Sequence, residues 1–224
     1  MRAFIGTKPD HGAAGAELIA KYSASVSTGT VGHITDFGAV TSLTALFRPC
    51  KAVGFALTVR APQGDGTILH EAISAIQPGD ILVIDTSQET RRAMWGGVAG
   101  YAAMKAGVGG VIIDGPVTDW VELGDNGTPV WCRGTTPLTG RRLGFEGQVN
   151  VPISIAGTSV APGDLVLADS DGIYFLPFEL AKEMVDALAA REAREVVIRA
   201  RLDVGEKLPD ISKSLAADAA GEHK

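Results

Sequence analysis

The stretch that decides the fold is WGGVAGYAAMKAGVGGVIIDGPVTD, residues 95–119. Residues 94–106 have the composition and length of a helix, and Gly107 stands where a C-capping glycine belongs. The run GGVIID at 109–114 is typical of a strand buried on both faces, and ILVID at 81–85 precedes the helix with the same character. This strand–helix–strand order predicts parallel strands joined by a right-handed crossover.

The flanking sequence extends this unit into one α/β domain. No linker divides the chain, so we expect a single domain over residues 1–210 and a flexible tail over 211–224. Apolar spacing predicts helices at 13–25, after Asp65 or Thr67 as the cap, and from about 177 to 203. Further strands are expected at 51–60 and within TPVWCRG (128–134), QVNVPISIAG (148–157) and DLVLADSDGIYFLP (164–177).

Composition excludes several classes of protein. Of 224 residues, 20 are Lys or Arg and 26 are Asp or Glu, and the resulting charge of −6 argues against a nucleic-acid partner. The two cysteines are far apart, without metal-knuckle spacing. No apolar run reaches the length of a membrane span, and MRAFIGTKPDHG lacks the apolar stretch of a signal peptide. We therefore expect a cytoplasmic protein without a membrane partner.

The 28 glycines include a pair, Gly96 and Gly97, at the start of the predicted helix. Within that helix the N–H groups of Gly97, Val98 and Ala99 have no partner, so they could seat a carboxylate or phosphate. Alternatively, the glycines only permit tight packing of helix against sheet. The local pattern supports both interpretations equally, and it matches neither a dinucleotide-binding fingerprint nor a P-loop.

Two carboxylates, Asp114 and Asp119, bracket a Gly-Pro turn after the second strand. Loops that follow parallel strands usually carry the ligand site of an α/β sheet, and one carboxylate with several waters is a common way to hold Mg²⁺. Spacing alone favours a turn or capping role for each aspartate.

The motif at 95–119, followed by PVWCRG, NVPISIAG and VAPGDLVLADSDG, resembles the RraA-like family. This family includes the class II 4-hydroxy-4-methyl-2-oxoglutarate / 4-carboxy-4-hydroxy-2-oxoadipate aldolases and the regulator of ribonuclease E activity. The similarity covers about residues 26 to 210. It implies a swivelling β/β/α-type fold with a C-terminal helix, assembled as a homotrimer or hexamer with sites between subunits.

The resemblance also implies a site. The loop of Gly96, Gly97, Val98 and Ala99 would bind a small 2-oxo acid, and Asp119 would hold Mg²⁺ or Mn²⁺, largely through waters.

Two more distant residues are implied as catalytic candidates. Glu195 is the best match to an acidic residue lent to the neighbouring subunit's site. His33 lies in STGTVGHITD, which in this family runs near the substrate pocket, and imidazole suits proton transfer near neutral pH. A lone histidine in such a loop is, however, more often structural.

One position departs from the family pattern. The aldolases carry Arg immediately before the metal aspartate, where this chain has Thr118. That arginine is expected to clamp the pyruvate carboxylate and stabilise the enolate, and its loss would cost roughly 2–4 kcal/mol unless another cation replaces it. The candidate replacements are Arg133, which we also count among the substrate-binding residues, and Arg91 or Arg92, for which a solvated surface role is the commoner alternative.

Two functions follow as hypotheses. The first is a metal-dependent carbon–carbon lyase, an aldolase or oxaloacetate decarboxylase, in which the metal at Asp119 polarises the 2-oxo group and a water oriented by Glu195 shuttles the proton. The alternative is a non-catalytic regulator that binds a ribonuclease or another protein partner.

Overall fold

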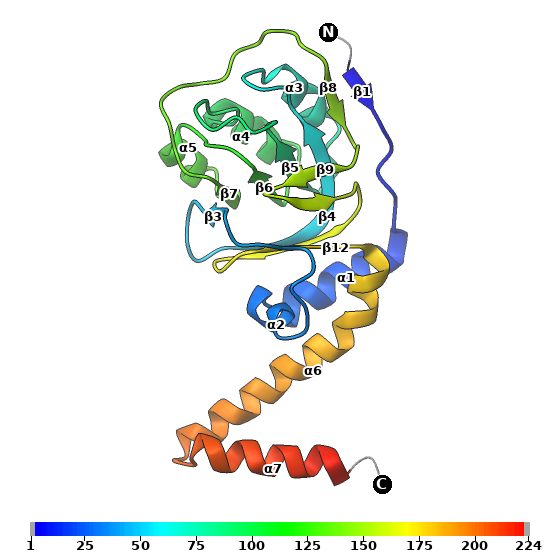
Figure 1. Cartoon of the computed structure of the whole chain (residues 1–224), viewed down its shortest axis with the longest axis vertical. Coiled ribbons are helices and arrows are strands. Elements are labelled where there is room, and N and C mark those ends of the chain that lie inside the picture. The colour runs from blue at the N-terminus through cyan, green and yellow to red at the C-terminus, as the bar shows by residue number, and fades with distance from the viewer. Residues whose placement is uncertain (1–2, 222–224) are drawn as a thin grey trace.

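Strand β4 (Lys51–Arg60) is the centre of the sheet in the computed structural model, which describes residues 3–221 and side chains as far as residue 215 (Figure 1). It pairs in parallel with β5 (Ile81–Asp85) on one side. On the other side its first half pairs antiparallel with β11 (Leu165–Asp169), and its last two residues pair with β8 (Gly147–Val149). One long strand therefore joins the parallel and antiparallel parts of a ten-stranded sheet.

The parallel part continues from β5 to β6 (Gly110–Ile113) and β7 (Val130–Cys132). The crossovers contain α3 (Thr67–Ser74), α4 (Gly97–Lys105) and α5 (Trp120–Asp125), which gather on one face of these strands (Figure 1). The predicted parallel strand–helix–strand unit is thus confirmed. The C-terminal ends of its strands, and the loops that follow them, form one edge of the sheet.

The remaining strands complete the other side. They are β1 (Ala3–Ile5), beside β8; β2 (Ala39–Val40) and β12 (Ile173–Leu176), beyond β11; β3 (Thr44–Ala45), beside β7; and the separate pair β9 (Ile153–Ile155) and β10 (Thr158–Val160). Helices α1 (Gly12–Ser25) and α2 (Thr28–Gly32) lie against β11 and β12 from outside.

Alternating side chains divide the interior into three cores. In β5, Leu82 and Ile84 pack beneath α3 and α4, whereas Ile81 and Val83 enter a second core between the two parts of the sheet. In β11 the side chain of Leu167 faces α1 and α6 instead. All these side chains are fully buried, as the continuous apolar runs predicted, and burial of each contributes roughly 1.5–3 kcal/mol. The resulting order of layers is the expected β/β/α arrangement.

The C-terminal segment forms an arm. Helix α6 (Phe178–Asp203), predicted from its periodicity, leaves the body, and α7 (Leu208–Gly221) folds back at its end (Figure 1). The tail expected over 211–224 forms part of α7 as far as Gly221, and the side chain of Ile211 is fully buried. Residues 222–224 lie outside the described part.

Among residues 3–221, no helix combines the length and the apolar character needed to cross a membrane.

Candidate functional site

A cavity of about 540 Å³ lies at the N-terminus of α4, within the size range of small-molecule sites. Its walls come from α3, from the segment that leads into α4, from the turn before α5, and from residues 139–142. The predicted residues Gly96, Gly97, Val98, Ala99, Thr118 and Asp119 all line this cavity.

The first turn of α4 faces the carboxylate of Asp119. The N–H group of Gly97 donates to Asp119 Oδ2 at 3.1 Å. The N–H groups of Val98 and Ala99 donate to no acceptor within the described part of the chain. Two amides at the N-terminus of α4 thus remain free for an anion, and the amide of Gly97 is occupied by an acidic side chain.

The glycines are required by the closeness of the two loops. A Cβ atom on Gly96 would lie 2.6 Å from Thr118 Cγ2 and 2.7 Å from Asp119 Oδ2. A Cβ atom on Gly97 would overlap the carboxylate of Glu122. The close packing at the glycine pair is therefore present, and it brings Asp119 to the N-terminus of α4.

Asp119 itself has a left-handed backbone, with φ 55° and ψ 41°. Non-glycine residues in this region are uncommon, although aspartate tolerates it better than most, and such residues cluster at functional sites. Its Oδ1 accepts from Thr118 Oγ1 at 3.2 Å, and Thr118 N donates to Trp95 O at 2.9 Å. The carboxylate is held on both oxygens yet is exposed to the cavity.

A buried carboxylate, Asp65, organises the opposite wall. Asp65 is fully buried, and it accepts hydrogen bonds from Thr67 at the start of α3 and from the N–H groups of Leu143 and Phe145. Burial alone would raise the pKa of Asp65, but these hydrogen bonds together hold it below its ordinary value. The carboxylate therefore fixes the segment after residue 140 to α3. The predicted N-cap, Asp65 or Thr67, is wrong, because Gly66 is the N-cap of α3.

This segment brings two arginines that sequence reasoning missed. Arg141 and Arg142 line the cavity together with Thr118 and Asp119. They follow Gly140 in TGRRLG, a stretch without periodicity or a known motif. The adjacent basic pair between glycines is the only signal the sequence offers, and local pattern does not connect it to residues 96–119.

The arginines proposed as replacements for the missing cation lie elsewhere. Arg133 lines a different cavity, of about 610 Å³, where its Nε donates to Asp114 Oδ1. Asp114 Oδ2 accepts from the N–H group of Ala156 at 2.7 Å, so Asp114 has a structural role. Arg92 Nη1 donates to Thr139 O at 3.0 Å, and neither it nor Arg91 lines the α4 cavity.

The structure does not bring His33 or Glu195 to this cavity within one chain. His33 ends α2, and its side chain is exposed. Glu195 lies on the arm helix α6, where it pairs with Arg199 at 2.9 Å. Both elements lie beyond β11 and β12, on the other side of the sheet from α4 (Figure 1).

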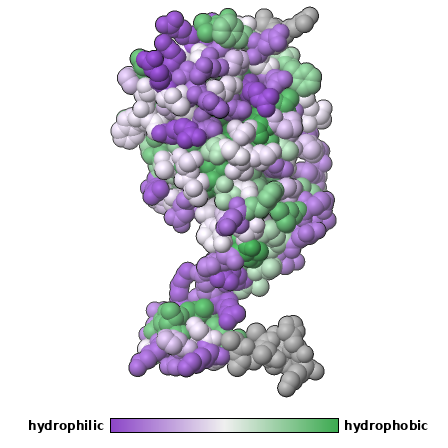
Figure 2. All heavy atoms as spheres, in the orientation of Figure 1, coloured by the Kyte–Doolittle hydropathy of each residue, from purple (hydrophilic) through white to green (hydrophobic). Residues whose placement is uncertain are grey.

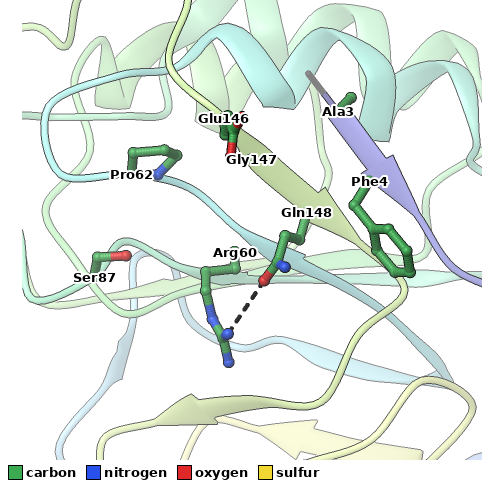
Figure 3. A pocket seen from close by; sticks show the side chains of 8 residues that line it. All are labelled: Ala3, Phe4, Arg60, Pro62, Ser87, Glu146, Gly147 and Gln148. Atoms are coloured by element: carbon green, nitrogen blue, oxygen red, sulfur yellow. Dashed lines mark hydrogen bonds between the residues drawn. The ribbon is translucent and has the colours of Figure 1, made fainter. Parts of the chain in front are cut away.

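Another cavity of about 540 Å³ lies between β1, β4 and β8 (Figure 3). Arg60 is the one cation among the described residues that line it, and it donates to Gln148 Oε1 at 3.2 Å and to Pro152 O at 2.8 Å. It also approaches Asp85 Oδ2 at 3.6 Å. Because this guanidinium is already paired, the cavity offers less to a charged ligand than the α4 cavity.

Comparison with known proteins identifies the family of this chain. The family model described as Aldolase/RraA matches residues 24–174. The chain belongs to the RraA-like family. The family includes 4-hydroxy-4-methyl-2-oxoglutarate aldolases.

The similar proteins are named either as aldolases or as inhibitors of RNA processing. A Thermus thermophilus 4-hydroxy-4-methyl-2-oxoglutarate aldolase is 31% identical over 113 residues, which cover 50% of this chain and 68% of that protein. The crystal structure of Streptomyces coelicolor RraAS2, described as an unusual member of the RNase ES inhibitor RraA family, superposes with a TM-score of 0.73 at 28% identity. That match covers 87% of this chain and 98% of the other. The RNA-processing inhibitor RraA from Thermus gives a TM-score of 0.61 at 26% identity, over 67% and 92% of the two chains.

The role of Asp65 can be tested through pH. Because its folded pKa is depressed, the ionised carboxylate stabilises the fold above its unfolded pKa, and this contribution is lost as pH falls through the folded pKa. We expect Asp65→Asn to lower the free energy of unfolding by about 1–3 kcal/mol at pH 7, since an amide cannot accept all these bonds. The difference from wild type should narrow below about pH 4.

Urea unfolding at pH 7 and at pH 3 measures this difference. Asp125→Asn, on an exposed residue at the end of α5, is the control and should change stability little at either pH. An equal wild-type–variant difference at both pH values would contradict the role assigned to the Asp65 charge.

Proposed function

We propose that this chain is a divalent-metal-dependent carbon–carbon lyase acting on a small 2-oxo acid, of the aldolase or oxaloacetate decarboxylase type. The observation that carries the proposal is the contact of Asp119 with the first turn of α4, at 3.1 Å, inside a cavity that also presents two free amides. Family membership supports the same chemistry.

Mg²⁺ or Mn²⁺ suits the donors at this place. Among the described residues no group of three or more His, Cys, Asp or Glu side chains could enclose a metal ion. Asp119 is exposed to the cavity, and the Glu122 carboxylate lies close to Gly97. Ions that keep most of their waters are bound by one or two carboxylates, so Asp119 would be the protein ligand. When bound, such an ion withdraws electrons from the 2-oxo group and favours cleavage of the adjacent carbon–carbon bond.

The chain's own residues would orient the substrate. The N–H groups of Val98 and Ala99 are placed to receive the carboxylate beside the 2-oxo group. Thr118 keeps Asp119 in position through its hydroxyl. The apolar side chains of Leu69 and Met94 line the cavity and limit the access of water.

Loss of activity on removal of Asp119 tests the proposal. We expect wild type with Mg²⁺ to release pyruvate from oxaloacetate. Asp119→Ala should lower the rate at least about 100-fold, because the variant loses both the metal ion and the negative charge that positions it. Coupled detection of pyruvate measures the rate, with Asp125→Asn as a charge-matched control. Equal rates in wild type and Asp119→Ala would refute the assignment.

A regulator that acts through a protein partner is the second candidate. The absence of the family's arginine at Thr118 and the likeness to RraAS2 over 98% of that chain favour it. Pull-down of a ribonuclease by wild type and by Asp119→Ala alike, with no metal-dependent turnover, would support this function over the lyase.

We further propose that the protein is a homotrimer or hexamer whose α6 arm completes the neighbour's site. Beyond its packing against α1 and α2, α6 carries exposed apolar side chains at Val196, Val197 and Leu202. Apolar (green) surface is present on this arm in Figure 2. Glu195 belongs to the same stretch, so an arm seated on a second copy would carry Glu195 toward it as a proton-transfer partner, and His33 would be brought by the same contact.

Subunit complementation tests this arrangement. If one site takes Asp119 from one subunit and Glu195 from another, Asp119→Ala and Glu195→Gln should each be impaired alone. Random mixed oligomers should regain about a quarter of wild-type activity, because each site draws independently from two halves of the population.

Co-expression followed by assay of the mixed oligomer measures the effect. Co-expression of Asp119→Ala with Asp119→Asn is the control and should regain nothing. Two impaired variants that fail to complement would place both residues in one subunit's site or remove Glu195 from it.

A further inference from the structure

The C-terminal edge of the parallel strands carries a row of four charged side chains. Strand β4 ends at Arg60 and β5 ends at Asp85, and these two residues are paired in register. Asp114 directly follows β6, and its N–H group donates to Ile84 O at 2.9 Å. The parallel pairing of β6 with β7 brings Arg133, which directly follows β7, beside Asp114. These four residues, which we call the charge row, therefore lie at one level on adjacent strands whose backbones are about 5 Å apart.

The charge row lies on the face of the sheet away from α4. The residues two positions before Asp85, Asp114 and Arg133 all belong to the core between the two parts of the sheet: Val83, Ile112 and Trp131. Because side chains alternate along a strand, the three charged side chains lie on that same face. They line the cavity of about 610 Å³, together with the turn after β5 and the hairpin of β9 and β10. Loops after parallel strands are the usual place for a ligand, and this edge has a cavity on each face of the sheet.

The contacts within the charge row leave two groups open to a ligand. Both oxygens of Asp114 are engaged, with Arg133 Nε and with Ala156 N. The Nη groups of Arg133 form no hydrogen bond within the described part of the chain. Asp85 Oδ1 accepts a backbone N–H group at 2.8 Å, whereas its Oδ2 accepts none from the described residues and lies 3.6 Å from Arg60 Nε. The cavity therefore presents a carboxylate oxygen at one side and guanidinium N–H donors at the other.

The two open groups are separated by more than one strand spacing. Asp85 and Arg133 lie two strands apart, and the guanidinium leans toward Asp114 on the strand between them, so the charges are about 5–10 Å apart. Polar side chains without a hydrogen bond among the described residues complete the wall: Gln88, Thr90 and Ser154. The two positive and two negative charges of the row cancel, which favours a ligand without net charge.

We propose that this cavity binds a zwitterion whose ammonium group and carboxylate are joined by a short chain, as in an ω-amino acid. The ammonium group donates to Asp85 Oδ2, and the carboxylate accepts from the Nη groups of Arg133, which match it as a fork. The site lies on the other face of the sheet from the α4 cavity and does not depend on the proposed lyase activity.

Three ligands with the same five-carbon chain test the proposal. 5-Aminopentanoate has both charges, pentanoate has only the carboxylate, and pentylamine has only the ammonium group. Titration followed by nuclear magnetic resonance should give wild type an affinity for 5-aminopentanoate at least about 10-fold above its affinity for either of the others, because each charge-assisted hydrogen bond contributes.

Two variants assign the ends of the ligand. Asp85→Asn should weaken the binding of 5-aminopentanoate and pentylamine about 10-fold and leave pentanoate unchanged. Arg133→Gln should weaken 5-aminopentanoate and pentanoate and leave pentylamine unchanged. A merely structural role of either residue would change the affinities for all three ligands alike.

A third variant and a control complete the experiment. Ser154→Phe fills the cavity without removing an ion pair and should abolish binding of 5-aminopentanoate, whereas Asp125→Asn, exposed on α5, should leave it unchanged. Circular dichroism checks folding, and Ser154→Phe decides the question if Arg133→Gln, which deprives Asp114 of its partner, does not fold. Equal affinities for the three ligands in wild type, a parallel loss of all three in Asp85→Asn, or undiminished binding in Ser154→Phe would overturn the assignment.

Discussion

The geometry of the site depends on the contact between the Asp119 carboxylate and the amide of Gly97. It ties the loop after β5 to the loop after β6, and there is no room between them for a side chain on residue 96. The same closeness coincides with the left-handed backbone at Asp119. This one contact thus positions the carboxylate of Asp119 and leaves the amides of Val98 and Ala99 free. It also requires glycine at positions 96 and 97.

The opposite charges that line the α4 cavity are separated along residues 93–95. The turn that carries Asp119 lies beside Trp95, and the segment that carries Arg141 and Arg142 lies beside Ala93, with apolar side chains between them. An acidic protein with a charge of −6 repels anions as a whole, so local cations matter for attracting an anionic substrate. Under our proposal the carboxylate of Asp119 binds the metal.

The sequence predicted the helices and strands that depend on local spacing, and it missed the contacts between residues far apart in the chain. The parallel strands on either side of α4 and the long helix α6 follow from apolar spacing within a few residues. The place of Asp119 beside Gly97 was expected only through family resemblance. Arg133 was expected at the site as a replacement for the cation missing at position 118, but it pairs with Asp114 in another cavity. The arginine segment could not be predicted, since its position depends on bridges to residues about 50 to 80 positions earlier and on the buried Asp65.

The most direct measurement is the affinity for Mn²⁺, followed by electron paramagnetic resonance, in wild type and Gly96→Ala. A methyl group at residue 96 must push Thr118 and Asp119 aside, while its extended backbone, with φ −162°, is open to alanine. Gly29→Ala, which has only Ser27 Oγ within 4 Å, at 3.8 Å, is the matched control. We expect Gly96→Ala to bind Mn²⁺ at least about 10-fold more weakly, with an unfolding transition near that of wild type. Unchanged Mn²⁺ affinity in a folded Gly96→Ala variant would contradict a metal site set by this contact.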